Sequence, residues 1–155
     1  MEFNLLYVSP SDSLYEPATV YLYDSFLRTY VVDSLRYSRS LPECIKHLPT
    51  SHVCSFYRES ITQILDSAKL YVAELEDVIL GVMLADPNTN SLYWISVKTD
   101  YRYIDTPKGP DFHSASIGSD MVRTVLNTQS PIATRFNTRA GRKFLESLIC
   151  QNEQT

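Results

Sequence analysis

The sequence predicts a single α+β domain of mixed three-layer α/β/α type, with a mostly antiparallel sheet and the element order β-α-α-β-β-β-α-β-α. Three observations lead to this prediction. Apolar residues recur at helical spacing in two long segments of the first half. Three strand-like segments then follow one another between residues 69 and 97, with only short turns between them. The last third alternates strand, helix, strand and helix, and 155 residues suit one domain.

The chain is predicted to begin with a strand and a helix. Phe3 to Val8 is rich in apolar residues, and the SPSDS that follows has turn composition. A helix is expected from about Glu16 or Pro17, because proline is favoured in a first turn. The apolar face of this helix is expected to comprise Val20, Tyr23, Phe26, Leu27 and Tyr30.

A loop and a second helix are expected next. Residues 33–51 contain Pro42 and Pro49, which favour a loop with one short helix. Residues 52–67 are predicted to be helical, because apolar residues recur there every three or four positions. Those positions are Val53, Phe56, Ile61, Ile64 and Leu65.

Residues 69–97 are predicted to form an antiparallel three-strand meander. Leu70 to Leu75 and Val78 to Ala85 are strand-like and leave only Glu76-Asp77 between them for a tight turn. The sequence ADPNTN forms a second turn, and Leu92 to Val97 then brings aromatic and β-branched residues together.

The last third contains the stretch that points to a function. Residues 98–117 are expected to be a loop and 118–127 a helix, with Met121, Val122, Val125 and Leu126 on one face. PIATRFN is expected to be a short strand, and 137–150 a final helix that begins at Asn137. Before the helix of 118–127, SASIGSD offers backbone N–H groups and a helix dipole that suit an anion, commonly phosphate.

Composition and charge argue against some classes of function and favour others. The net charge of −4 argues against a nucleic-acid-binding domain. The apolar runs are short of a membrane span and the first residues lack a signal-peptide pattern, so we expect a cytoplasmic protein. Five basic residues near the anion-binding stretch suit a phosphorylated small molecule, although a solvated basic face explains them equally well. They are Arg123, Arg135, Arg139, Arg142 and Lys143.

Several residues have a structural interpretation beside a functional one. The spacing C-x2-H-x4-H-x-C resembles a zinc site, but its middle gap is short, and a buried cysteine with helix-end histidines is the favoured interpretation. Trp94 is expected in the core rather than against an acyl chain. A group of tyrosines is expected to be half-buried packing residues rather than the lining of a substrate groove. The residues of the zinc-like spacing are Cys44, His47, His52 and Cys54. The tyrosines are Tyr15, Tyr21, Tyr23, Tyr30 and Tyr37.

The element order and three short motifs resemble the GNAT-type acetyltransferase superfamily. HSASIGSDMV resembles its acetyl-CoA loop, Gln/Arg-x-x-Gly-x-Gly/Ala, with His113, Ser116 and Gly118 at the three defined positions. ISVKTDYR resembles the end of its fourth strand. NTRAGRKFLESL resembles its Asn-x-x-Ala-x-x-Phe-Tyr-Glu stretch, with Leu145 at the tyrosine position. The chain departs from the pattern by the insertion YIDTPKGPDF and by a short C-terminal part.

The resemblance implies acetyl-CoA as co-substrate, no metal, and transfer of the acetyl group to a primary amine. Backbone amides of Ser114 to Ser119 would hold the pyrophosphate. The pantetheine would pair with strand 92–97 where it splays from 131–136. Backbone N–H groups near Ser96 to Lys98 would stabilise the oxyanion. The implied cofactor residues are Ile95, Ser96, Val97, His113, Ser114, Ala115, Ser116, Ile117, Gly118, Ser119 and Asn137.

Proton transfer requires a base and an acid, for which the sequence offers several candidates. The candidate bases are Glu74, Glu76 and Asp86, and the candidate acids in place of Leu145 are Tyr93, Tyr101 and Tyr103. Glu74, Glu76 and Tyr101 are taken as the candidate catalytic residues.

The charge distribution and the exposed sheet edge indicate the acceptor and the partners. The acidic N-terminal half favours a cationic acceptor, such as a protein lysine or a polyamine. The short C-terminal part leaves a sheet edge that a partner subunit would cover, so a homodimer is expected. The alternative function is a catalytically inactive GNAT-like module that binds a protein partner, in a phage or another mobile element.

Overall fold

The structure, a computed structural model, describes residues 3–32, 35, 41–98, 113–136 and 138–153. In these residues five strands form one sheet in the order β1-β2-β3-β4-β5. They are β1 (Asn4–Val8), β2 (Lys69–Leu75), β3 (Val78–Asp86), β4 (Ser91–Val97) and β5 (Ala133–Thr134). The first four strands are antiparallel and β5 runs parallel to β4. The predicted α+β class with a mostly antiparallel sheet is therefore confirmed.

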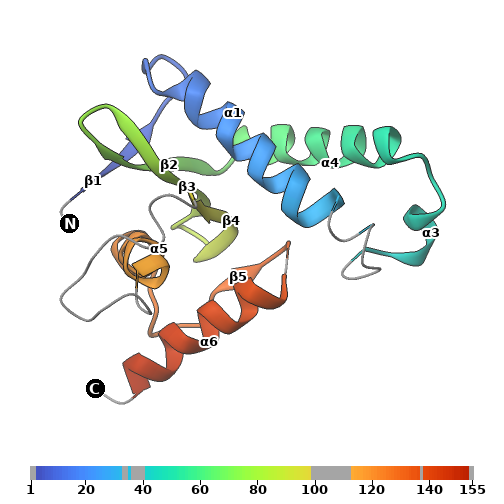
Figure 1. Cartoon of the computed structure of the whole chain (residues 1–155). Helices are drawn as coiled ribbons and strands as arrows, with labels where there is room; N and C mark the ends of the chain where they lie inside the picture. The colour runs from blue at the N-terminus through green and yellow to red at the C-terminus, as the bar shows by residue number, and fades with distance from the viewer. Residues whose placement is uncertain (1–2, 33–34, 36–40, 99–112, 137, 154–155) are drawn as a thin grey trace.

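Helices cover both faces of the sheet (Figure 1). One face carries α1 (Tyr15–Phe26), which continues as the π-helix η1 (Leu27–Val32), and α4 (Thr50–Leu65), with the short α3 (Glu43–Lys46) before α4. The other face carries α5 (His113–Val125) and α6 (Arg139–Glu153). Each face has its own buried apolar cluster, and β3 contributes to both because Ile79 to Ala85 are all buried.

The meander forms at the predicted residues. Glu76 and Asp77 have φ values of 51° and 65°, so both central positions of the β2–β3 turn are left-handed, as a type I′ turn requires. Leu84 pairs with Trp94 while the next residue, Ala85, pairs with Leu92. Tyr93 is therefore the extra residue of a β-bulge in β4. As a result, the consecutive side chains of Tyr93 and Trp94 both pack on the α1/α4 face.

The predicted apolar faces of two helices are wrong at one position each. Val20 on α1 is 62% exposed, because Ala18, Leu22 and Phe26 turn toward the sheet instead. Phe56 on α4 is 58% exposed, whereas Val53, Tyr57 and Ile61 are buried. In both helices, residues spaced three or four apart still form the buried face, but the face is rotated from the one predicted.

The helix α5 begins at His113 and not at Gly118, so the predicted loop of 98–117 is wrong over its last five residues. The segment HSASI contains serine and alanine and neither proline nor glycine, so nothing in it stops a helix. Gly118 lies inside the helix, beside the Phe144 ring of α6. Residues 99–112, which contain the insertion relative to the GNAT pattern, lie outside the described residues.

Asn90 fixes the connection that brings β5 beside β4. Its φ is 52°, a left-handed value that asparagine tolerates well. Its Nδ2 donates to the carbonyl oxygens of Asn127 (2.9 Å) and Pro131 (3.0 Å), and its Oδ1 accepts from the Asn127 amide (2.8 Å). The Ala133 amide donates to the Asn90 carbonyl at 3.1 Å. One turn residue therefore holds both ends of the α5–β5 connection.

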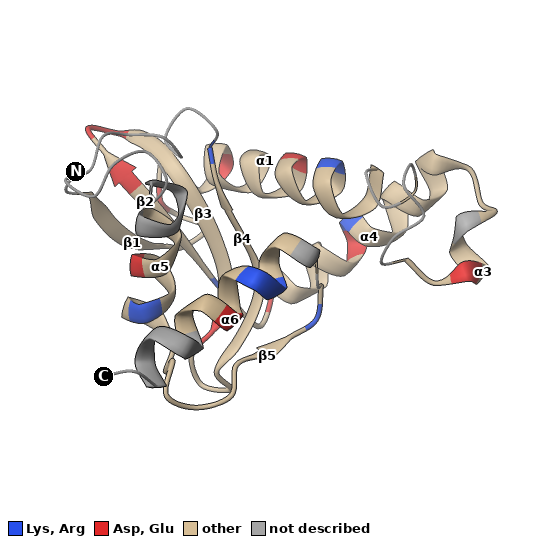
Figure 2. Ribbon diagram, turned by 60° about the horizontal axis from the view of Figure 1, so that its bottom comes forward, with Lys and Arg blue, Asp and Glu red and all other residues tan. Residues whose placement is uncertain are grey.

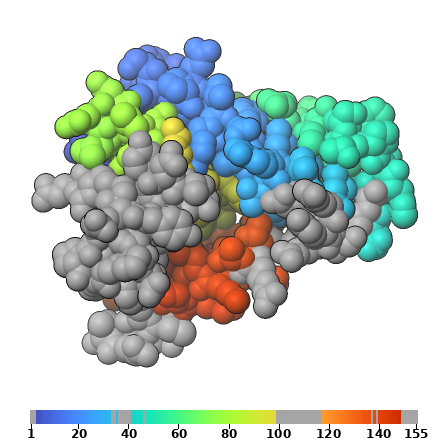
Figure 3. All heavy atoms as spheres, in the orientation of Figure 1, coloured from blue at the N-terminus to red at the C-terminus, as the bar shows by residue number. Residues whose placement is uncertain are grey.

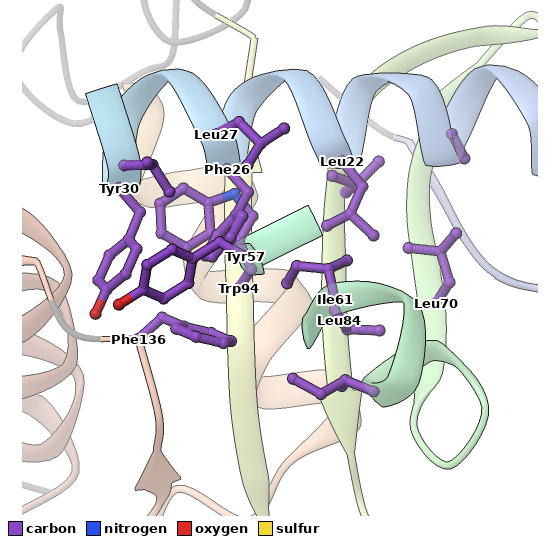
Figure 4. Packing of buried hydrophobic residues seen from close by; sticks show 14 of the residues in the cluster. Leu22, Phe26, Leu27, Tyr30, Tyr57, Ile61, Leu70, Leu84, Trp94 and Phe136 are labelled. Atoms are coloured by element: carbon purple, nitrogen blue, oxygen red, sulfur yellow. The ribbon is translucent and has the colours of Figure 1, made fainter. Parts of the chain in front are cut away.

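Five aromatic side chains gather on the α1/α4 side where β4 and β5 meet (Figure 4). The Phe26 ring lies at their centre, 4.8 Å from that of Phe136 and 5.2 Å from that of Trp94. The Trp94 Nε1 donates to Ser25 Oγ at 3.1 Å, which satisfies its polar atom in the core. The predicted core position of Trp94 is confirmed.

Tyr30 and Tyr57 place their hydroxyls side by side at the rim of this cluster (Figure 4). Burial raises the pKa of Tyr57 to about 12, with the neighbouring Tyr30 adding to the shift. Burial also raises the pKa of Tyr30. Of the predicted packing tyrosines, Tyr30 is buried, while Tyr15, Tyr21 and Tyr23 are half-buried against the same cluster.

We expect these two phenols to make the protein less stable in alkali. A raised folded-state pKa favours the protonated form, so its contribution is fully present below about pH 10, the pKa of an unfolded tyrosine. The contribution is lost as pH rises from about 10 to about 12. Urea unfolding across this window should show a steeper loss of stability for the wild type than for Tyr57→Phe. Equal slopes would contradict the expectation.

Candidate functional site

Within the described residues, the outer edge of β4 has a strand neighbour only at its start. Strand β5 pairs with β4 only through Ser91–Ala133 and Leu92–Thr134. From Tyr93 to Ser96, β4 has no strand neighbour on this side within the described part of the chain. Figure 3 shows a strip of β4 between α1 (blue) and α6 (red). An extended ligand that carries amide groups has the geometry to pair with such an edge.

The first turns of α5 lie beside this edge. A Cβ on Gly118 would lie 3.8 Å from Ile95 Cδ1 of β4 and 3.4 Å from the Phe144 ring. The first three residues of an α-helix have amides without an acceptor inside the helix, and here they are residues 113–115. These amides and the helix dipole suit an anion.

The predicted contact run of Ser114 to Ser119 is too long at its C-terminal end. Because the helix starts at His113, the amides of Ile117, Gly118 and Ser119 donate to carbonyls within the helix. Ile117 and Ser119 are also buried. The helical amides available for an anion are therefore those of His113 to Ala115, whose side chains lie outside the described part of the structure.

The predicted strand residues Ile95, Ser96 and Val97 are divided between the two faces of the sheet. Ile95 and Val97 pack with the α5/α6 cluster. Ser96 is half-buried on the α1 side, where its Oγ lies 2.8 Å from the Tyr21 hydroxyl. The Lys98 Nζ lies 5.3 Å from the centre of the Tyr21 ring. The Lys98 amide donates to the Leu80 carbonyl at 2.8 Å, so this predicted oxyanion donor is already engaged.

Sequence reasoning placed Tyr21 only among the packing tyrosines and missed its pairing with Ser96. The two residues are 75 positions apart, and no local pattern relates them. Gly81 of β3 was also missed. A Cβ there would lie 2.8 Å from the Ser96 carbonyl oxygen and 3.2 Å from Val97 Cα, so only glycine lets β3 and β4 approach this closely.

The candidate bases lie on the neighbouring strands rather than on β4. Glu74 is on β2, half-buried, and accepts a 3.4 Å hydrogen bond from Asn4 Nδ2. Strand β3 separates it from β4, which amounts to about 10 Å across two strand spacings. Glu76 is in the β2–β3 turn. Asp86 is at the opposite end of the sheet, where it pairs with Ser91 and accepts from the Asn88 amide.

Three other predicted residues lie outside the described part of the chain. They are the candidate acids Tyr101 and Tyr103 and the candidate cofactor residue Asn137. Leu145, at the position of the superfamily tyrosine, is half-buried against the α5/α6 cluster.

The basic residues of the last third do not form one patch. Arg123 is exposed on α5, Arg135 follows β5, and Arg142 and Lys143 are exposed on α6. Figure 2 shows acidic residues on α5 and α6 beside these basic ones. The mixture of signs is typical of a solvated surface.

The cysteine–histidine segment is divided between two short structural elements. His47 follows α3 and His52 is in the first turn of α4, as predicted for helix-end histidines. Cys44 is exposed, which differs from the buried cysteine expected, and Cys54 is half-buried. Within the described ranges, no three His, Cys, Asp or Glu side chains gather as metal ligands would.

No family model, curated protein or solved structure matches this chain. None of the helices within the described residues is both long and apolar enough to cross a membrane.

Proposed function

We propose that the protein is a cytoplasmic N-acetyltransferase with a GNAT-like fold, which transfers an acetyl group from acetyl-CoA to a primary amine. The observation that supports this most is the open edge of β4 beside the first turn of α5. The strand edge matches the amides of pantetheine, and the helix terminus matches a pyrophosphate. Acetyl-CoA carries both groups in one extended molecule.

In this proposal each group has a defined place. The pantetheine runs along Tyr93 to Ser96 as an added strand. The pyrophosphate lies at the amides of His113 to Ala115. The Tyr21–Ser96 hydroxyl pair then lies where the pantetheine enters from the pyrophosphate site, and the thioester lies toward Tyr93.

The reaction is a direct transfer. The neutral amine nitrogen attacks the thioester carbonyl carbon, the C–S bond then breaks, and the CoA thiolate takes up a proton. The β-bulge leaves Tyr93 without a partner residue on β3, and its backbone N–H is the proposed group that stabilises the oxyanion. Glu74 is the proposed base and acts through a chain of waters, because it is two strands from β4 and the register places it beyond Val97, the last residue of that strand. The acidic first half of the chain favours a protein lysine or a polyamine as acceptor.

A substitution at Ser116 tests the proposed pyrophosphate site without disturbing the fold. A glutamate in the first turn of a helix stabilises the helix dipole, but it repels a phosphate at the same place. Ser116→Glu should therefore keep or raise the melting temperature and weaken acetyl-CoA binding at least about tenfold, or about 1.4 kcal/mol. Ser116→Gln is the neutral control and should bind like the wild type in calorimetry.

Turnover on a panel of amines completes the test. Binding of acetyl-CoA with release of free thiol supports the proposal. If the wild type does not bind acetyl-CoA, or if Ser116→Glu binds it as well as Ser116→Gln, the proposed site is wrong.

A GNAT-like binding module is the second candidate, because β4 carries no carboxylate and Leu145 cannot donate a proton. Acetyl-CoA binding without turnover on any amine would favour this alternative. The same titrations therefore separate a catalyst from a module that only binds.

A further inference from the structure

Strand β1 forms the edge of the sheet opposite β5. Its outer side has no strand neighbour within the residues that the structure describes, so its backbone groups on that side are available for pairing. Tyr7 of this strand is 54% exposed. Its ring packs at a tilt on that of Tyr71, with a centroid distance of 6.0 Å, and lies under the Lys69 ammonium at 5.4 Å.

A pocket of about 630 Å³ lies on the same face of the sheet, between β1, β2 and α5. Its apolar wall includes Phe3, Leu5 and Leu75, and its α5 side includes Asp120, Arg123 and Thr124. Leu5 and Tyr7 are two positions apart on β1, so their side chains point to the same face. The exposed ring and the pocket are therefore neighbours along one strand.

We propose that two copies of this chain pair through β1, antiparallel and centred on Leu6. In this register Leu6 faces the partner's Leu6, and Leu5 faces the partner's Tyr7. A two-fold axis perpendicular to the sheet keeps the same face of both sheets on one side. Each Tyr7 ring therefore enters the other copy beside Leu5, over the pocket, and the two sheets become continuous.

Charge complementarity favours a second copy as the occupant. Lys69 lies over the Tyr7 ring and would be carried with it toward the other copy's pocket, where Asp120 lies. Both residues are exposed, and neither makes an ion pair within the described ranges. By symmetry the contact between Lys69 and the partner's Asp120 forms twice.

The arrangement is self-complementary, as a two-fold interface requires. Tyr7 and Leu5, which lines the pocket, are on the same five-residue strand, two positions apart. When two copies of this strand pair antiparallel, the Tyr7 side chain of each copy meets the pocket of the other without any rearrangement of the sheet. The edge concerned is opposite the one for which the sequence predicted a partner subunit.

Sedimentation velocity over a range of concentrations, with the full chain and no ligand, tests this proposal. The wild type should show a monomer–dimer equilibrium. Tyr7→Ser should weaken the dimer at least about a hundredfold, as the loss of a central aromatic anchor does. Val20→Ser, at an exposed position on α1 in the other helical layer, is the matched control and should leave the equilibrium unchanged.

A charge exchange tests the pairing register. Lys69→Glu and Asp120→Lys should each weaken the dimer about tenfold, and the double variant should recover most of that loss. Recovery distinguishes a contact between copies from damage within one copy, and it still decides the matter if Tyr7→Ser fails to fold. A wild type that stays monomeric, a dimer insensitive to Tyr7→Ser, or a double variant weaker than both single variants would overturn the proposal.

Discussion

Replacing Phe26 with alanine is expected to lower the free energy of unfolding by about 3–5 kcal/mol, which is the largest effect among the substitutions considered. Phe26 has no exposed surface, and its ring contacts those of Tyr30, Tyr57, Trp94 and Phe136. These rings come from α4, η1, β4 and the segment after β5. Alanine would therefore leave a cavity between the α1/α4 layer and the part of the sheet where β4 and β5 meet.

Phe56→Ala is the matched control for this prediction. Phe56 is also a phenylalanine on a helix of the same layer, and its ring is 5.1 Å from that of Tyr57, but its side chain is 58% exposed. Its removal should cost less than about 1 kcal/mol. Urea unfolding of both variants measures the difference, and similar losses for the two would show that Phe26 is not the centre of the core.

Gly81→Ala is expected to destabilise the protein by about 1–3 kcal/mol, the usual range for overpacking. The new methyl group would lie 2.8 Å from a backbone oxygen of β4, and backbone cannot swing aside as a side chain can. Strand β4 must then move away from β3 at Ser96 and Val97. Because Ser96 belongs to the proposed edge for the pantetheine, acetyl-CoA binding should also weaken.

Gly118→Ala provides the opposite expectation for the same chemical change. A Cβ there would meet the Phe144 ring at 3.4 Å, which is an ordinary contact. Alanine is favoured over glycine inside a helix by about 1 kcal/mol. Thermal unfolding should therefore show Gly118→Ala to be as stable as the wild type or more stable, while Gly81→Ala melts lower. If Gly118→Ala melted lower than Gly81→Ala, the packing described for β3, β4 and α5 would be wrong.

Local patterns predicted most of the elements, because each follows from residues close in sequence. The Glu76-Asp77 turn and the strands that flank it were placed correctly from alternation and spacing alone. The faces of α1 and α4 were less certain, because Ala18 and Val20 are both apolar and only the sheet decides which one is buried. The start of α5 was missed because HSASI has no strong local preference, whereas Ile117 and Met121 gain burial only in the helix.

The candidate site was predictable only in part for the same reason. The sequence indicated that strand 92–97 and the start of the following helix belong together, and the structure brings Ile95 against Gly118. The Tyr93 bulge, the Tyr21–Ser96 hydroxyl pair and the close approach at Gly81 depend on contacts between distant segments. No single-sequence pattern encodes such contacts.

The central claim is that acetyl-CoA binds along the open edge of β4 and at the first turn of α5. Hydrogen–deuterium exchange with and without acetyl-CoA tests it most directly, because an added strand and an anion both slow the exchange of the amides they bind. We predict added protection in peptides that cover Tyr93 to Ser96 and His113 to Ala115, and no added protection in β1. Acetyl-CoA binding with protection elsewhere and unchanged exchange in these two segments would contradict the account.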